Sequence, residues 1–145
     1  MFRDFENNLK HDLVFVTQMA DDLDGSSVDM KDYRHLAFYA CFGDSGDTLA
    51  SGLYIELEVE DSPDDSSFTD CADALITNSV TGNNTGTFAL INAPAEDQCI
   101  KMCEYKGAAR YVRPVVSITG THTNGCPVSI MAVRSGYQQK PVTNT

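Results

Sequence analysis

The sequence predicts an all-β protein, a jelly-roll-like antiparallel β-sandwich of about seven or eight strands with extended N- and C-terminal arms. Several segments alternate apolar and polar residues with a period of two, and turn-forming residues separate them at short intervals. No segment has the apolar periodicity of a long helix. We divide the 145 residues into an N-terminal arm (1–10), a β-sandwich domain (11–135) and a C-terminal tail (136–145).

The first half of the chain holds the clearest alternating strands. Residues 33–42 predict a strand whose core face consists of Leu36, Phe38, Ala40 and Phe42. In residues 53–60, apolar side chains alternate with Glu56, Glu58 and Glu60, so the acidic side is expected to face solvent or the basic patch of a partner. Further strands are predicted at residues 11–18, 87–91 and 98–105.

The longest β-prone run is residues 109–119, and residues 128–133 resume the pattern after a polar turn. Together they predict a long hairpin. Pro114 lies inside the first of its strands and has no N–H to donate, so it predicts an edge position, a bulge or a bend. We expect Arg110 and Arg113 to pair with the acidic strand at Glu56–Glu60, within one molecule or across two.

Two segments have no clear strand pattern. Residues 20–32 are acidic and predict a solvated turn. Ala20 and Lys31 stand where an EF-hand loop places its strongest ligands, so calcium binding is not expected there. Residues 68–76 predict a short strand or an irregular edge segment.

Charge is distributed unevenly along the chain. The formal net charge is -11, with 4 Lys/Arg against 20 Asp/Glu in residues 1–97 and 6 against 1 in residues 98–145. Such a division favours solubility, docking onto a partner or head-to-tail self-association. Basic residues are too sparse for a nucleic-acid-binding module, and no apolar run approaches the ~20 residues of a membrane span. The N-terminal residues do not resemble a secretory signal.

Known catalytic or cofactor motifs do not occur in the sequence. The five cysteines are most simply free thiols, and their spacing completes no zinc site. His11, His35 and His122 belong to no recognisable signature, and the most direct interpretation of each is structural. We therefore expect no enzyme activity, no cofactor and no metal.

Short motifs give the chain a likeness to a known family. They are the acidic stretch at residues 56–65 followed by Ser67-Phe68, then Ala109-Arg110-Tyr111-Val112-Arg113, Thr119-Gly120, and the stretch from Arg134 through Tyr137 to Pro141. In these motifs the sequence, from about residue 30 onward, resembles small structural proteins of tailed bacteriophages, including the cement or decoration proteins that clamp the outside of a capsid.

The resemblance implies a jelly-roll fold without catalysis, and a protein made in the host bacterial cytoplasm and carried on the capsid exterior. Its implied partners are the major capsid protein and further copies of the chain, as a dimer or trimer, with neither nucleic acid nor membrane. Candidate contact residues are Phe2, Phe5, Arg110, Arg113, Arg134 and Tyr137.

An alternative is a receptor- or carbohydrate-binding module of a phage head fibre or tail. It depends on Tyr33, Tyr39 and Tyr54, which would lie exposed on one sheet face and stack on sugars. The chain has no Trp, which argues against this alternative.

Overall fold

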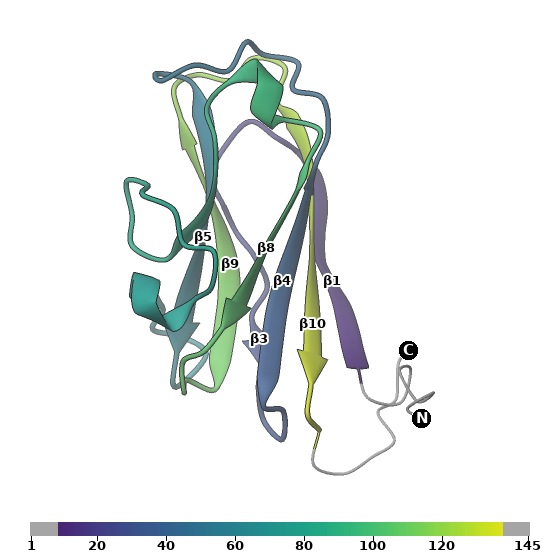
Figure 1. Cartoon of the computed structure of the whole chain (residues 1–145), viewed down its shortest axis with the longest axis vertical. Coiled ribbons are helices and arrows are strands. Elements are labelled where there is room, and N and C mark those ends of the chain that lie inside the picture. Colours follow the sequence, from purple (N-terminus) through teal and green to yellow (C-terminus); the bar gives the residue numbers. More distant parts are fainter. Residues whose placement is uncertain (1–8, 138–145) are drawn as a thin grey trace.

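The computed structural model describes residues 9–137, which form two antiparallel sheets packed as a sandwich (Figure 1). Ten strands and two short 3-10 helices follow in chain order: β1 (Leu9–Met19), β2 (Leu23–Asp24), β3 (Val28–Asp29), β4 (His35–Phe42), β5 (Tyr54–Ser62), β6 (Thr69–Asp70), η2 (Asp73–Leu75), β7 (Thr87–Ile91), η3 (Pro94–Glu96), β8 (Ile100–Tyr105), β9 (Tyr111–Thr119) and β10 (Cys126–Ser135). The all-β prediction is confirmed. The ten strands exceed the predicted seven or eight because β2, β3 and β6 have only two residues each.

The order of strand pairing is that of a jelly roll. Sheet A has the order β1-β10-β4-β8, and in sheet B β9 lies between β5 and the short β2 and β3, while β5 also pairs with β6 and β7. The first strand pairs with the last, β2 and β3 pair with β9, β4 pairs with β8, and β5 pairs with β7. This nested pairing brings the two ends of the described chain together, since Leu9 lies opposite Ser135.

The core lies between the sheets and consists of the alternate side chains predicted for it. Leu36, Phe38, Ala40 and Phe42 of β4 are buried, as expected from the alternation in that segment. From the opposite sheet, Ile55, Leu57 and Val59 of β5 and Val112 and Val116 of β9 complete the packing.

The predicted hairpin of residues 109–133 does not form. β9 belongs to sheet B and β10 to sheet A, so the connection over residues 120–125 crosses from one sheet to the other. Two neighbouring β segments joined by a short turn resemble a hairpin in sequence, whether they pair with each other or with strands elsewhere. Here each strand has longer pairings elsewhere, β9 with β5 and β10 with β1 and β4.

Pro114 stands at a break in the edge of sheet B. Its carbonyl accepts a 2.8 Å hydrogen bond from the Gly25 N–H, between the two residues of β2 and the two of β3. Gly25 allows this close approach, because a Cβ there would lie 2.6 Å from the Pro114 oxygen. The edge is therefore interrupted at the residue that cannot donate. Residues 20–32, predicted as a solvated turn, supply this interrupted edge strand.

The acidic side of β5 does not face solvent, contrary to the sequence-based prediction. Glu56 and Glu58 are only 2% and 3% exposed, because the connection from β5 to β7, residues 63–86, folds over the outer face of sheet B. The Asn83 N–H from this covering segment donates a 2.6 Å hydrogen bond to Glu56 Oε1. The segment predicted as irregular, residues 68–76, contributes β6 and η2 to the cover.

Candidate interaction surfaces

Three of the predicted contact residues, Arg110, Arg134 and Tyr137, gather at one end of the sandwich. We call this end the base; it is formed by segments 30–34 and 106–110 and the chain after β10. Arg134 spans the two sheets there, because its guanidinium donates to Asp12 Oδ2 of β1 at 2.5 Å and to the Asp29 carbonyl of β3 at 2.6 Å. Its first role is to close the sandwich, which leaves its side chain largely buried.

An aromatic contact continues this cluster to the end of the described chain. The Arg134 guanidinium lies 4.6 Å from the centre of the Tyr33 ring, and that ring lies 4.8 Å from the Tyr137 ring at an angle of 33°. Tyr137 is thus held against the segment before β4. Phe2 and Phe5, the other predicted arm contacts, lie outside the described residues.

Arg110 forms a bidentate ion pair with Asp29. Its Nε and Nη2 atoms donate to the two carboxylate oxygens at 3.0 and 2.9 Å. The Arg110 hydrogen bond lowers the pKa of Asp29 below its usual range, although desolvation acts in the opposite direction. About half of the Arg110 side chain is exposed, so it remains accessible to a partner.

Arg113 lies apart from these residues, on the covered outer face of sheet B. It pairs with Glu60 at 2.6 Å and with Asp24 at 3.0 Å, and its guanidinium lies 4.3 Å from the centre of the Phe68 ring. The predicted pairing of a late arginine with the acidic strand therefore occurs within one molecule, at Glu60. All of these contacts of the Arg113 side chain lie within the molecule.

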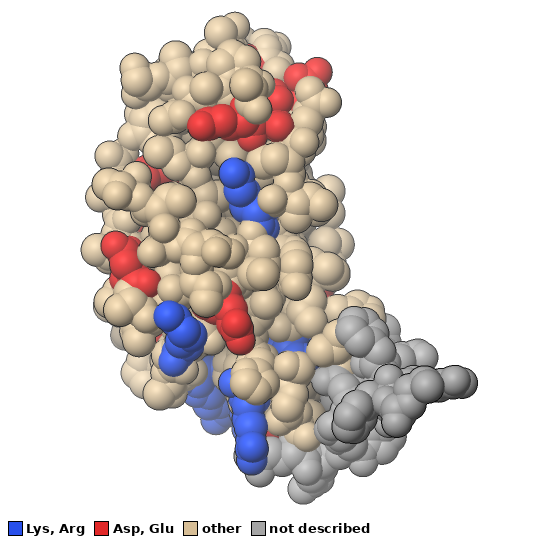
Figure 2. All heavy atoms as spheres, viewed as in Figure 1, with Lys and Arg blue, Asp and Glu red and all other residues tan. Residues whose placement is uncertain are grey.

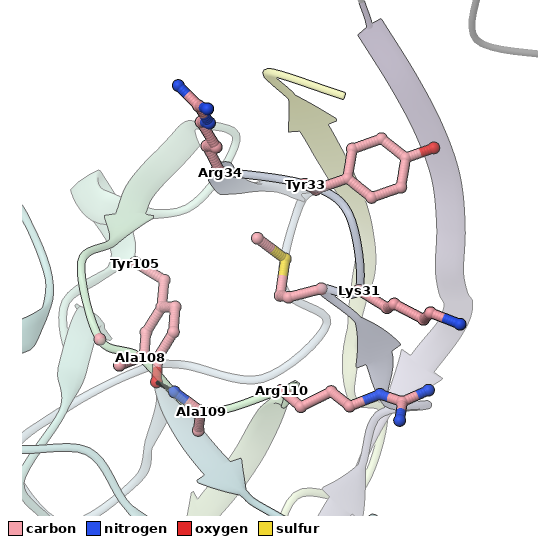
Figure 3. Close-up of a pocket in the computed structure, with 9 residues that line it drawn as sticks. Lys31, Tyr33, Arg34, Tyr105, Ala108, Ala109 and Arg110 are labelled. Carbon is pink, nitrogen blue, oxygen red and sulfur yellow. Dashed lines mark hydrogen bonds between the residues drawn. The ribbon is translucent and has the colours of Figure 1, made fainter. Parts of the chain in front are cut away.

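A hollow of about 280 Å³ opens at the base. Figure 3 shows Lys31 and Arg110 extending in one direction, away from Tyr105, and Arg34 extending in another. Tyr105 is tied down on the opposite side, where its hydroxyl donates to Asp61 Oδ2 at 2.6 Å. Burial and this hydrogen bond raise the pKa of Tyr105. The cations border the hollow without converging in it, so the geometry favours a charged rim over an enclosed anion site.

The two ends of the sandwich differ in charge. We call the end opposite the base the tip; it consists of loops 20–22, 43–53, 92–99 and 120–125. These four loops, all within residues 9–137, hold no Lys or Arg and six carboxylates: Asp21, Asp22, Asp44, Asp47, Glu96 and Asp97. Segments 30–34 and 106–110 at the base hold Lys31, Arg34, Lys106 and Arg110 with one acid, Asp32, and the turn after β5, which ends on this side opposite Tyr111, adds Asp64 and Asp65. Figure 2 shows a group of acidic side chains at the tip, whereas most basic side chains of this view lie towards the base, with further acidic side chains among them.

Two neighbouring rows on the outer face of sheet A are uncharged across all four strands, and Glu104, opposite Ala37, lies in the next row towards the base. Leu13, Met131, Tyr39 and Met102 lie opposite one another in neighbouring strands, and so do Val16, Ser129, Cys41 and Ile100. We call these eight residues the apolar face. Leu13, Val16 and Ile100 are 67%, 66% and 68% exposed. Leu13 and Val16 both point outward, three residues apart, because a bulge in β1 leaves Val14 without an opposite residue.

The sequence did not indicate that a carboxylate at the tip, Asp47, accepts hydrogen bonds from another loop. Asp47 accepts hydrogen bonds from the backbone N–H groups of Thr123, Asn124 and Gly125, and its Oδ2 lies 3.7 Å from Nδ1 of the buried His122. Desolvation opposes ionisation of Asp47, but the three N–H donors prevail and lower its pKa. Each loop has the composition of an ordinary turn, so no local signal shows that the two meet.

Glu58 is the clearest carboxyl held in an unfavourable place. Burial raises its pKa, although Ser117 Oγ donates a 2.8 Å hydrogen bond to Oε1 and acts in the opposite direction. Its alternation with apolar neighbours indicated an outward direction correctly. That pattern contains no information about the segment that covers it.

The three tyrosines proposed as a sugar-binding platform do not share a sheet face. Tyr39 lies on the outer face of sheet A, Tyr54 belongs to β5 of sheet B, and Tyr33 precedes β4 at the base. A side-chain hydrogen bond joins Tyr54 to Asn83 of the covering segment. That prediction is wrong, because each residue was assigned to a face without knowledge of its sheet.

Within the described part of the chain, no cluster of three or more His, Cys, Asp or Glu side chains could hold a metal ion. No helix of residues 9–137 is long and apolar enough to cross a membrane. The five cysteines are free, as expected, and burial raises the pKa of Cys103 to about 12. The sequence matches no protein-family model and no curated protein.

Proposed function

We propose that this chain is a non-enzymatic structural protein of a phage virion, a cement or decoration protein that binds and stabilises the major capsid shell from outside. The observation that carries the proposal is the base. Leu9 and Tyr137 lie at this end, so the arms predicted from the sequence begin beside the exposed Arg110, Arg34 and Lys31. Such an arrangement suits attachment by two arms and a basic rim to an acidic protein surface.

Two further features support this orientation. The jelly roll is a fold that viral capsid proteins use repeatedly, although a fold alone never establishes a function. The acidic tip lies at the opposite end, where it would face solvent and keep decorated particles from aggregating.

The first experiment asks whether the chain belongs to a particle. Virions purified from the source of the sequence by density gradient are probed with an antibody raised against the purified chain. We expect the chain in the particle fraction in stoichiometric amount. A chain that stays in the lysate supernatant and never sediments with particles contradicts the proposal.

The second experiment tests the base as the attachment site. Particles stripped of the chain are mixed with purified protein, and the bound amount is measured after sedimentation. Removal of residues 1–8, or the double variant Arg34→Glu/Arg110→Glu, is expected to reduce binding at least tenfold, whereas Asp44→Lys at the tip leaves it unchanged. If the tip variant loses binding and the base variants keep it, the orientation is reversed.

A further inference from the structure

The apolar face of sheet A is too large and too exposed to be an ordinary surface. Its eight residues include no charged side chain. Six of them are exposed, among them Met131 and Met102 at 40% and 36%, whereas Tyr39 and Ser129 are half-buried. Proteins that act as monomers rarely expose contiguous apolar patches larger than a few hundred Å². No described segment covers this face, in contrast to the outer face of sheet B.

The dimensions of this face set the size of the contact it can make. With strands about 4.8 Å apart and side chains repeating every ~6.7 Å, four strands and four rows occupy roughly 19 Å by 27 Å. The outermost rows are formed by Gln18 with Pro127 and by His11 with Val133, Ala37 and Glu104, so one carboxylate lies at the edge of this area. Two such faces in contact bury about 1,000 Å², at the lower end of specific protein interfaces, where reversible contacts lie.

The charges at the ends of the strands indicate the occupant. At β4, Arg34 precedes the strand at the base and Asp44 follows it at the tip. The pattern recurs at β8, where Asp97 precedes the strand at the tip and Lys106 follows it at the base. A second sheet that runs antiparallel over the first would place each basic end over an acidic end.

We propose that the apolar face of sheet A binds a second copy of this chain, as a two-fold symmetric dimer in which β4 of one copy runs antiparallel over β4 of the other. A two-fold axis makes the same face serve both partners, so an uncharged face meets an uncharged face. Arg34 of each copy lies near Asp44 of the other, and the two acidic tips point to opposite ends of the dimer. A parallel arrangement would bring both acidic tips together, which their charge disfavours.

This inference is tested on the purified chain alone and does not depend on capsid binding. Because each end of the dimer holds one base and one tip, only one copy of a dimer could attach to the capsid by its base. Sedimentation velocity from about 1 to 200 µM is expected to show a reversible monomer–dimer equilibrium. Met131→Glu is expected to weaken dimerisation at least tenfold by placing a charge in the interface, and Leu13→Asp, at a more exposed site, should do the same. Circular dichroism checks that both variants remain folded.

The matched control is Val80→Glu. Val80 is 39% exposed, close to Met131, but it belongs to the covering segment on the other side of the molecule, so its substitution leaves the dimer intact. A chain that stays monomeric at 200 µM overturns the proposal, and so does a dimer that Met131→Glu does not weaken.

A charge exchange tests the antiparallel arrangement. Arg34→Glu and Asp44→Lys each create two like-charge pairs in the proposed dimer, and each is expected to raise the dissociation constant at least fivefold at low ionic strength. The double variant restores opposite charges and is expected to return within twofold of the parent. A double variant as weak as the worse single variant rejects the antiparallel pairing of β4.

Discussion

The outer faces of the two sheets differ in how far they are covered, and the difference is the reverse of what their composition suggests. The outer face of sheet B carries Glu56, Glu58, Glu60 and Arg113, yet segment 63–86 covers it and two of these carboxylates are almost inaccessible. The outer face of sheet A is largely apolar, with Glu104 near its base edge, and no described segment lies over it. A strand pattern therefore shows which side chains share a face. Whether that face meets solvent depends on the length and path of a connection elsewhere in the chain.

The contrast also explains how charge can be tolerated under a cover. Glu56 accepts a hydrogen bond from the covering backbone, Glu58 from Ser117, and Glu60 from Arg113. Each buried carboxylate has a donor, which offsets part of the free energy lost on desolvation. The exposed apolar residues of sheet A have no comparable internal partner, which is why we assign them to another molecule.

Among substitutions on the covered face, that of Arg113 should cause the largest loss in the free energy of unfolding. Arg113→Ala leaves Glu60 without its partner and removes the stacking on Phe68, so we expect a loss of about 3 kcal/mol in the free energy of unfolding. Urea unfolding followed by circular dichroism measures it. Arg110→Ala, at an exposed ion pair, should lose less than about 1 kcal/mol. Equal losses would show that the cover does not distinguish the two arginines.

A small change in the covering segment should come next. A Cβ at Gly82 would lie 2.2 Å from Glu56 Oε1 and 2.7 Å from Thr87 Oγ1, so Gly82→Ala must move the segment or the buried carboxylate. We expect a loss of about 2 kcal/mol and faster hydrogen exchange of β5 amides. Gly52→Ala is the control, because nothing lies within 4 Å of its Cβ position. If both variants unfold alike, the covering segment is not closely packed.

Substitution of Glu58 should have a smaller effect on stability, and it should stabilise the folded state instead of destabilising it. Its folded pKa is raised above the usual 4.5, so between that pH and the raised pKa the folded state holds more protons, and stability falls as pH rises. Glu58→Gln removes the charge, and we expect the melting temperature at pH 7 to rise by about 3 °C, with the gain disappearing near pH 4. Glu104→Gln, on the exposed edge strand, should change neither the melting temperature at pH 7 nor its dependence on pH. A gain that grows toward low pH would contradict the assignment.

The smallest effect on folding is expected from the apolar face itself. Ile100 is 68% exposed, so Ile100→Thr should change the free energy of unfolding of the monomer by less than about 0.5 kcal/mol when measured near 1 µM. The same change at Ile130, which lies inside the sandwich, should lose several times more. A large loss at Ile100 in dilute protein would mean that the face already packs against part of its own chain.

The fold could be predicted to a useful level because the alternation of apolar residues is strong where the core is. The segments at Leu36–Phe42 and Ile55–Val59 pointed the correct side chains inward. The partners of strands were less predictable. The run from 109 to 133 has the composition of a hairpin, but its two strands pair in different sheets because pairing depends on β1, β4 and β5, far away in the sequence.

Among the candidate contact residues, the structure divides what the sequence treated alike. Arg110, Arg113 and Arg134 are similar in composition and context, yet Arg134 closes the sandwich, Arg113 is enclosed under the covering segment, and only Arg110 keeps substantial exposure. The apolar face was not recognised at all. Its residues come from four strands, and Leu13 and Val16 share a face only because of a bulge that alternation does not reveal.

The sequence by itself determined the all-β class and the inward side of each long strand, because period-two alternation is a local property of a half-buried strand. It also contained the separation of acidic and basic residues along the chain. Only the tertiary structure decided which outer face is covered and which carboxylates find donors. It also decided that four loops without Lys or Arg gather at one end of the sandwich, while Lys31, Arg34, Lys106 and Arg110 lie at the other. Those properties depend on contacts between residues distant in sequence, and the nested pairing of the jelly roll creates them.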